Sequence, residues 1–511
     1  MGKALKKIIT IIAFIIIFVL YLVNTVYYSN MTHWEIPQIQ YYGVQRLTIS
    51  IVIGLIILVL SYFLNKIKIK KKLKIIIISF LLAIYSVVQI TWITKTPAVQ
   101  FADSLVVMQI AEKMEDNQEL NEYQKNYLQY YPQQLTMAVI FMKIFKICAN
   151  TNELIFKILN ILSNILTVLG LYFILFEIQK NYKINRILFW ILSLSFIPVI
   201  LLSCFIYGDF IGLACVVWSL WFAQKYLKCE RKNYIFFIGI LMCLACLVRM
   251  NYFIFEIAII ITIIIGKLEK KELNFLVVFK TVIVCSYIIV ATLIPNILIK
   301  EIYSSKYDLK KDNAFSTIPY LYMGMSEGER ANGWYNDETD KIVENLMFEK
   351  ENRELITAEC KQKLKNRISF LINHPMYTVR FYRDKIITIW SDPTMEFKFY
   401  NTYNCEELHN EVNPIVKKIL YEKWYDYIVV YVKSLILIIL GGAMLLLILK
   451  HKNLSLTCIP LYLVFIGGFL FHIIWEAKSR YIIPYVLVLI PVACAGFEEF
   501  IEKIKNKKEK M

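Results

Sequence analysis

The sequence predicts an all-α polytopic membrane protein with about twelve transmembrane helices. Hydrophobic residues make up 58% of its 511 residues, whereas soluble domains are about 45–50% apolar. Many stretches run for roughly 18 or more residues almost without charge, which is typical of helices that cross a membrane and satisfy their own backbone hydrogen bonds there. The net charge of +17 falls mostly in short loops, as the positive-inside rule predicts, and does not indicate nucleic-acid binding.

Residues 1–74 are predicted to hold two additional N-terminal spans, at 8–27 and 46–64, and a cytoplasmic loop. The first apolar run is too long for a signal peptide and no small-residue cleavage site follows it, so we expect an uncleaved span with a cytoplasmic N-terminus. The lysine-rich stretch 66–74 predicts a cytoplasmic loop. The next span, at 75–94, therefore exits on the outer face.

The first outer loop is predicted at 95–153, and it contains a short apolar stretch at 135–147. If this stretch crossed the membrane, the basic loops 180–186 and 225–232 would lie outside, against the charge rule. Lys143 and Lys146 also interrupt it. We therefore predict a juxtamembrane helix in the outer interface.

Three further regions follow from this division of the chain. Residues 75–299 form the predicted central transmembrane module, 300–424 a small extracytoplasmic and mainly helical domain, and 425–511 the C-terminal spans with a basic cytoplasmic tail. The remaining spans are predicted at 154–177, 187–206, 210–227, 234–249, 252–266, 273–299, 425–449, 454–474 and 480–499.

The eleven cysteines are scattered, mostly within apolar runs. Cys243 and Cys246 form a C-x-x-C pattern, but on a membrane helix without partner ligands, which favours helix packing over metal or redox chemistry. Cys360 and Cys405 both fall in the predicted outer domain, where a disulfide is chemically allowed.

Two acidic residues stand at helix ends on the predicted outer face. Asp103 follows the third span by about ten residues, where a carboxylate has to be solvated or functional, and Asp209 lies in the tight turn Tyr207-Gly208-Asp209. Either residue could simply cap a helix. Two carboxylates on one face also suit general-base chemistry, or a divalent cation such as Mg²⁺ or Mn²⁺.

Basic residues gather on the same predicted face. Arg249 lies in one outer turn, and Lys478 and Arg480 lie in the last one. Cations at this level suit the phosphate of a lipid, although pairing with Glu476 or snorkelling would also explain them.

The chain from about residue 75 onward resembles the GT-C superfamily of polytopic glycosyltransferases, and most of all its protein O-mannosyltransferase and lipid A aminoarabinose transferase branch. Similar stretches are Asp103 to Ala111, Tyr127 to Gln134, Met323-Gly324-Met325 with Gly333-Trp334-Tyr335-Asn336, and Trp475 to Tyr481. One position departs from the pattern, because the mannosyltransferases have an Asp-Glu pair where this chain has Asp103 followed by Ser104.

The resemblance implies inverting transfer of a sugar from a polyprenyl-phosphate donor to an extracytoplasmic glycan, lipid or protein. Asp103 would be the general base, and Asp209 would orient the site or hold a cation. The basic residues Arg249, Lys478 and Arg480 would bind the lipid phosphate. The acceptor or sugar would be contacted by Tyr130, Tyr131, Gln133 and Trp334.

Two other classes of function remain open at this stage. A transporter or flippase of lipid-linked sugars would bind its substrate near the membrane midplane, whereas the charges here collect at one face. A non-catalytic assembly protein for surface glycans is the other alternative. The sequence has no Walker, dinucleotide-binding or HExxH motif.

Overall fold

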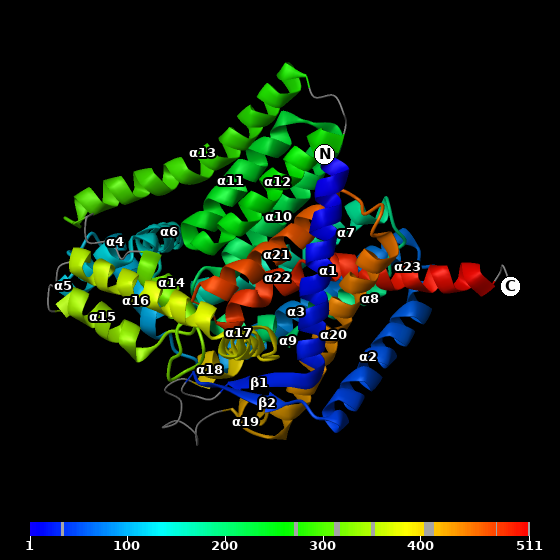
Figure 1. Cartoon of the computed structure of the whole chain (residues 1–511), viewed down its shortest axis with the longest axis horizontal. Helices are drawn as coiled ribbons and strands as arrows, with labels where there is room; N and C mark the ends of the chain where they lie inside the picture. Colours follow the sequence, from blue (N-terminus) through cyan, green and yellow to red (C-terminus); the bar gives the residue numbers. More distant parts are fainter. Residues whose placement is uncertain are drawn as a thin grey trace.

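The computed structural model describes residues 1–31, 35–269, 274–310, 317–348, 353–402, 413–476 and 478–508. Within these ranges all regular secondary structure is helical apart from one two-stranded hairpin, which confirms the predicted all-α class (Figure 1). Cys405, with which Cys360 could pair, lies outside the described residues; Cys360 is buried and makes no disulfide with any described cysteine.

Nine helical segments in the described part of the chain are long and apolar enough to cross a membrane. They are α1 (Gly2–Val26), α2 (Val44–Asn65), α3 (Lys71–Lys95), α7 (Leu154–Gln179), the broken helix α8 (Arg186–Leu194), α9 (Ile197–Leu201) and η1 (Leu202–Cys204), α10 (Asp209–Cys229), η2 (Met250–Tyr252) with α12 (Phe253–Glu269), α13 (Phe275–Lys306) and α20 (Lys423–Lys450).

Three further segments are apolar, but each is either too short or too bent to count as a single long membrane-crossing helix. The segments η4 (Ser479–Ile482) and α22 (Ile483–Leu487) meet α23 (Ile490–Lys508) at a bend of 51° and could form a tenth span. The helices α11 (Lys232–Val248) and α21 (Ile459–Ile474) are apolar but shorter. The multi-pass class is therefore confirmed, and the number of twelve spans stays a prediction.

The two faces of the bundle follow from ion pairs between helix ends. Glu177 near the end of α7 pairs with Lys225 at 2.9 Å and Lys228 at 2.5 Å near the end of α10. At the start of α1, Lys6 pairs with Glu269 at the end of α12 at 2.6 Å. The predicted basic loops therefore gather at one set of helix ends, while α10 begins at Asp209 at the opposite set.

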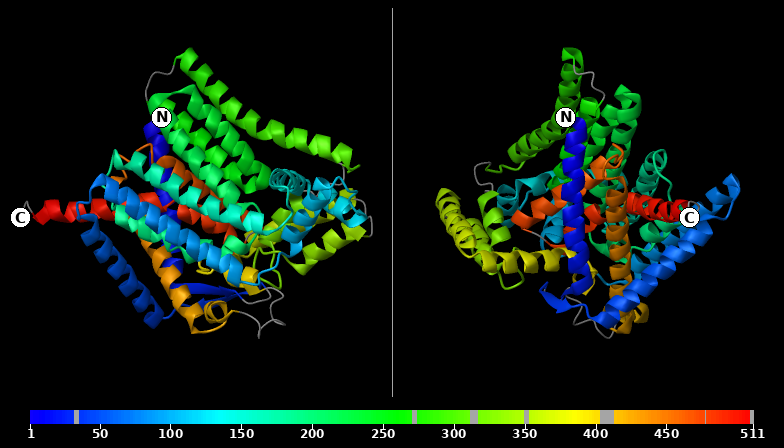
Figure 2. Two further views of the ribbon diagram at one scale, coloured as in Figure 1. Left: turned by 180° about the vertical axis from the view of Figure 1, so that it is seen from behind. Right: turned by 45° about the vertical axis from the view of Figure 1, so that its right-hand side comes forward.

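The segment predicted to lie at the interface forms the helix α6 (Pro132–Cys148), which is not one of the nine long apolar segments. It packs against α4 (Ala102–Glu115), α5 (Glu122–Tyr130) and α11. The helices α4, α5 and α6 gather with α14 (Thr317–Met325), α15 (Asp337–Phe348) and α16 (Arg353–Asn373) at one side of the molecule (Figure 1). The C-terminal end of α23 projects from the other side in Figure 1 and in the left-hand view of Figure 2.

A hairpin that the sequence analysis did not predict joins the first two spans. Strands β1 (Tyr27–Met31) and β2 (Pro37–Tyr41) pair antiparallel, with Tyr27 opposite Tyr41. The hairpin lies against α17 (Pro375–Trp390), and the amide of Ser29 donates to the carbonyl of Ser391 at 3.1 Å. The supposed N-terminal addition is therefore packed into the region that bears the candidate site.

The span predicted at 187–206 is broken, because Pro198 stands at the start of α9 and has no backbone N–H. Side chains satisfy the carbonyls that the break leaves free. The Leu201 carbonyl accepts hydrogen bonds from Trp92 Nε1 at 2.9 Å and from Asn401 Nδ2 at 3.0 Å. In a membrane interior such partners replace water, and they fix the irregular segment that leads to Tyr207.

Candidate functional site

Asp103 lies in the first turn of α4 and its side chain is exposed. It is not the N-cap of α4, since Phe101 occupies that position. Instead Oδ1 accepts a hydrogen bond from the Tyr127 hydroxyl at 2.9 Å, and Oδ2 accepts one from the Tyr207 hydroxyl at 2.8 Å. A carboxylate offers about four lone-pair positions, so this one is held in place and can still accept a proton from a ligand.

The two tyrosines are buried donors. Burial raises the pKa of both hydroxyls well above the usual value, and the charge of Asp103 raises it further. Both phenols therefore stay protonated and donate to the carboxylate. Gln134 at the start of α6 donates in turn to the Tyr207 hydroxyl, which directs the phenol proton toward Asp103.

Asp209 is the first residue of α10 and joins the two arginines that the sequence analysis selected. Arg249 Nε lies 3.0 Å from Oδ1, and Arg480 donates from one terminal nitrogen to Oδ2 at 2.7 Å. Asp209 is not the N-cap of α10, since Gly208 occupies that position. Two guanidinium groups against one carboxylate leave a surplus positive charge at this point.

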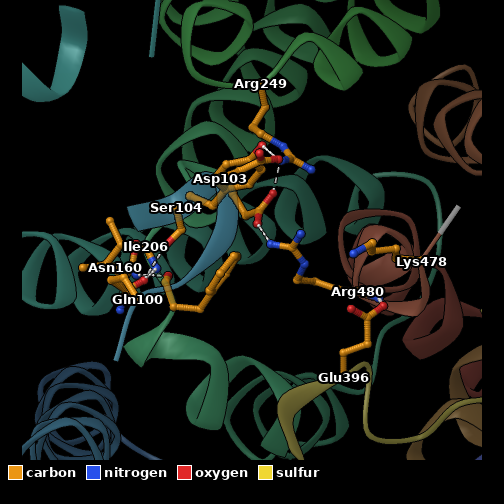
Figure 3. A network of polar contacts seen from close by, with 12 residues as sticks. Gln100, Asp103, Ser104, Asn160, Ile206, Arg249, Glu396, Lys478 and Arg480 are labelled. Atoms are coloured by element: carbon orange, nitrogen blue, oxygen red, sulfur yellow. Dashed lines mark hydrogen bonds and ion pairs between the residues drawn. The ribbon is translucent and has the colours of Figure 1, made fainter. Parts of the chain in front are cut away.

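Aromatic rings surround both guanidinium groups. Arg249 lies 4.7 Å from the ring centroid of Tyr207, and Arg480 lies 4.3 Å from Phe205 and 4.7 Å from Tyr400. Such faces stabilise a cation where water is scarce. In Figure 3, the side chains of Asp103, Arg249 and Arg480 lie near one another.

A cavity of about 30 Å³ opens beside Asp209, Arg249 and Arg480 and is otherwise lined mainly by aromatic and aliphatic side chains, among them Tyr252 and Tyr481. This volume is room for about two water molecules. The cavity can therefore receive the oxygens of a small anionic group, whereas a whole sugar ring would have to bind outside it.

Lys478, the third predicted phosphate ligand, has a different partner. It pairs with Glu35 in the hairpin, which also pairs with Arg330. The structure therefore brings Arg249 and Arg480 together on Asp209 and neutralises Lys478 elsewhere. Glu35 was not among the site residues predicted from the sequence, although its place between the first two spans put it on the predicted outer face.

The predicted acceptor contacts fall into two groups. Tyr130 and Tyr131 lie at the junction of α5 and α6, followed by the half-buried Gln133, and the ring of Tyr131 lies 5.3 Å from that of Tyr127. These residues are near Asp103. Trp334 is completely buried, and its Nε1 donates to Thr388 at 3.2 Å, so its ring has no exposed face for a sugar.

Ser104, where the chain departs from the related pattern, has a structural contact. Its hydroxyl donates to Gln100 Oε1 at 2.8 Å, and the same oxygen accepts the Ile206 amide at 2.9 Å. Gln100 Nε2 donates to the Cys204 carbonyl at 2.9 Å. Ser104 and Gln100 thus tie the start of α4 to the segment before Tyr207 (Figure 3).

The residues around Asp209 suit an anion better than a divalent cation. Both carboxylate oxygens already face guanidinium groups, which would repel a metal ion. No cluster of three His, Cys, Asp or Glu side chains with metal-site spacing occurs among the residues described. The predicted Mg²⁺ or Mn²⁺ therefore stays a prediction.

Fold and site together define a multi-pass membrane protein in which Tyr207 connects an exposed carboxylate to two arginines, one buried and one partly buried. No protein-family model matches the sequence, and no curated protein is similar to it.

Proposed function

We propose that this protein is an integral membrane glycosyltransferase that moves a sugar from a polyprenyl-phosphate donor to an extracytoplasmic acceptor, with inversion. The observation that carries the proposal is that Tyr207 connects an exposed carboxylate to a cationic pair. Its hydroxyl binds Asp103 at 2.8 Å, and its ring lies 4.7 Å from the Arg249 guanidinium.

In this reaction Asp103 is the general base. The acceptor hydroxyl attacks the anomeric carbon of the donor, its proton passes to Asp103, and the bond from that carbon to the phosphate oxygen breaks with its electron pair on the phosphate. A carboxylate suits this task because the acceptor loses its proton only as the new bond forms. Attack opposite the leaving phosphate inverts the anomeric centre.

Arg249 and Arg480 are the proposed ligands of the leaving phosphate. A phosphate leaving group carries its own negative charge and needs electrostatic stabilisation, and fixed cations in a water-poor site supply it. Asp209 holds the two guanidinium groups at one place and leaves them a surplus positive charge. Lys478 is adjacent but paired with Glu35, so we assign it a secondary role.

Sidedness supports an extracytoplasmic site. The basic loops cluster at the helix ends opposite Asp209, and such loops are usually cytoplasmic. We accordingly propose cytoplasmic termini, and twelve spans in which α11, α21 and the bent α22–α23 segment complete the nine long ones.

The test uses the purified full chain in lipid nanodiscs with a polyprenyl-phosphate sugar as the donor. Release of polyprenyl phosphate that depends on an added acceptor supports the proposal. Movement of the intact donor across vesicle membranes, without its consumption, would instead identify a transporter. Asp116→Asn is a matched control for Asp103→Asn, because Asp116 is an exposed acid at the other end of α4.

A further inference from the structure

Glu396, in the loop between α17 and α18 (Phe397–Thr402), has unusual backbone and burial. Met395 and Glu396 both adopt left-handed φ angles, 47° and 66°, a conformation that costs energy for non-glycine residues and is enriched at functional sites. The Glu396 side chain is fully buried, and its Oε2 atom has no hydrogen-bond partner among the residues that the structure describes.

The other carboxyl oxygen of Glu396 contacts the segment that carries the arginine site. Oε1 accepts the backbone amide of Arg480 at 3.0 Å and lies 3.2 Å from the hydroxyl of Ser479. Figure 3 shows Glu396 beside Arg480 and Lys478. Glu396 thus holds the main chain of the residue whose guanidinium pairs with Asp209.

A second buried acid, Asp392, binds the same hydroxyl. Its Oδ2 lies 2.6 Å from Ser479 Oγ, and its Oδ1 accepts the amide and hydroxyl of Thr394 at 2.8 and 2.7 Å. A hydroxyl has one proton to donate, and the shorter contact assigns it to Asp392. Glu396 can then hydrogen-bond to the Ser479 oxygen only by donating a proton of its own.

We propose that Glu396 is a positioning residue that carries a proton in this arrangement. Its carboxyl group donates to Ser479, Ser479 donates to Asp392, and Oε1 still accepts the Arg480 amide. In this form Glu396 orients Arg480 without adding a negative charge beside the arginines.

The surrounding charges agree with a neutral acid that is close to ionising. Burial raises the pKa of Glu396 to about 7, and the Lys478 charge opposes the rise. Burial also raises the pKa of Asp392, but hydrogen bonds from Ser479 and Thr394 oppose that rise. The groups that face Glu396 are Lys478, Ser479 and Arg480 in the last turn, Glu35 in the hairpin, Tyr400 in α18, and Asp392.

The consequence for ligand binding rests on the proposed function. When the pH rises through about 7, Glu396 ionises and places a negative charge beside Lys478 and Arg480. A lipid phosphate then meets a less positive site. Glu396→Gln is neutral and cannot ionise, so ligand binding should not depend on pH through this position; its amide can replace only one of the two contacts of Oε1, the donor to Ser479 or the acceptor for the Arg480 amide.

Infrared difference spectroscopy of the full chain tests the proton directly. Below neutral pH, the wild-type protein should show a protonated-carboxyl C=O band that fades above neutrality and is absent in Glu396→Gln. Glu119→Gln, at an exposed acid in the loop between α4 and α5, should keep the band. Ser479→Ala should shift the band, because it removes the acceptor of the proton, and this second variant serves if Glu396→Gln does not fold. A band that is unchanged in Glu396→Gln or in Ser479→Ala would overturn the inference.

Binding of a polyprenyl monophosphate provides the second measurement. We expect its affinity for the wild-type protein to fall as the pH rises above neutrality, by about tenfold for each pH unit. In Glu396→Gln the affinity should stay level. Equal pH profiles would refute the positioning role. A band that behaves as expected in a protein that neither binds nor releases lipid phosphate would refute the proposed function and leave the protonated Glu396 standing.

Discussion

Tyr207 donates its hydroxyl proton to Asp103 at 2.8 Å while its ring contacts Arg249, with 4.7 Å between guanidinium and ring centroid. One side chain therefore touches both the exposed acid and the cationic pair. Because Tyr207 is buried, this link is fixed before any ligand binds. Each part of the link can be tested by substitution.

Replacing Asp103 with asparagine should remove the proton acceptor. General-base catalysis contributes about 10²–10⁴-fold to rates, so we expect Asp103→Asn to lower kcat by this factor while donor affinity changes little. Turnover is measured as released polyprenyl phosphate. Full turnover in a folded Asp103→Asn protein would show that another group accepts the proton.

Removing one phenol hydroxyl should weaken the orientation of Asp103 and leave the arginine contacts intact. A hydrogen bond to a charged group contributes about 1.5–3 kcal/mol, so Tyr207→Phe should lower kcat by roughly 10- to 150-fold. Tyr127→Phe removes the matching bond to Oδ1. Tyr287→Phe, on the exposed surface of α13, is the control, and a loss as large there would mean that the effect is not local.

Asp209→Asn should destabilise the fold, because it leaves two guanidinium groups without their shared carboxylate. Removing one partner of a buried ion pair lowers the free energy of unfolding by about 3–5 kcal/mol. Because Asp209 is partly exposed, we expect a loss near the lower end of this range. Thermal unfolding in detergent measures the loss. Asp116→Asn should unfold like the wild type; equal stability of the two variants would mean that the arginines find other partners.

Gly208 should not tolerate a side chain. It has φ +74°, and a Cβ atom there would lie 3.0 Å from Cβ of Val248. Gly43 has the same φ but a different ψ, 150° against −4°, and a Cβ atom there would meet nothing within 4 Å. Gly208→Ala should lose roughly 1–2 kcal/mol to the left-handed backbone and further stability to the close contact with Val248, and Gly43→Ala should lose about 1–3 kcal/mol to its own strained backbone alone. In thermal unfolding and turnover assays, Gly208→Ala should also lose some activity, since Asp209 follows directly, whereas Gly43→Ala should not.

Lys385 of α17 should make the stability depend on pH. It is fully buried and donates to the carbonyls of Gly324, Ile473 and Trp475. Burial lowers the pKa of Lys385 to about 7, so between pH 7 and the usual lysine pKa the unfolded chain binds more protons than the folded one. Stability should therefore rise with pH across that window.

Lys385→Met should remove this pH dependence. It should also lower stability by about 1–3 kcal/mol for each buried carbonyl left without a donor. Lys361→Met, at an exposed position of α16, is the control. If chemical unfolding at several pH values shows parallel curves for wild type and Lys385→Met, the buried amine does not titrate in this window.

Part of the candidate site followed from charge and hydropathy alone. Asp103, Asp209, Arg249 and Arg480 were found because each stands at the end of an apolar run, on the face opposite the basic loops. Tyr127 and Tyr207 lie in stretches that the sequence analysis singled out, but nothing in a single tyrosine tells whether it faces lipid, core or an acid. Glu35 and Glu396 were missed because their partners are distant in sequence.

The sequence by itself determined the class of the protein and the level at which its charges lie. Long apolar runs have to become helices in lipid, and basic loops set their direction. Only the tertiary structure decided that Asp103 meets Tyr207, that Arg249 and Arg480 share Asp209, and that Lys478 turns to Glu35. The physical reason is that spans are specified by local hydrophobicity, whereas these contacts join helix ends through packing and buried electrostatics that depend on every neighbour at once.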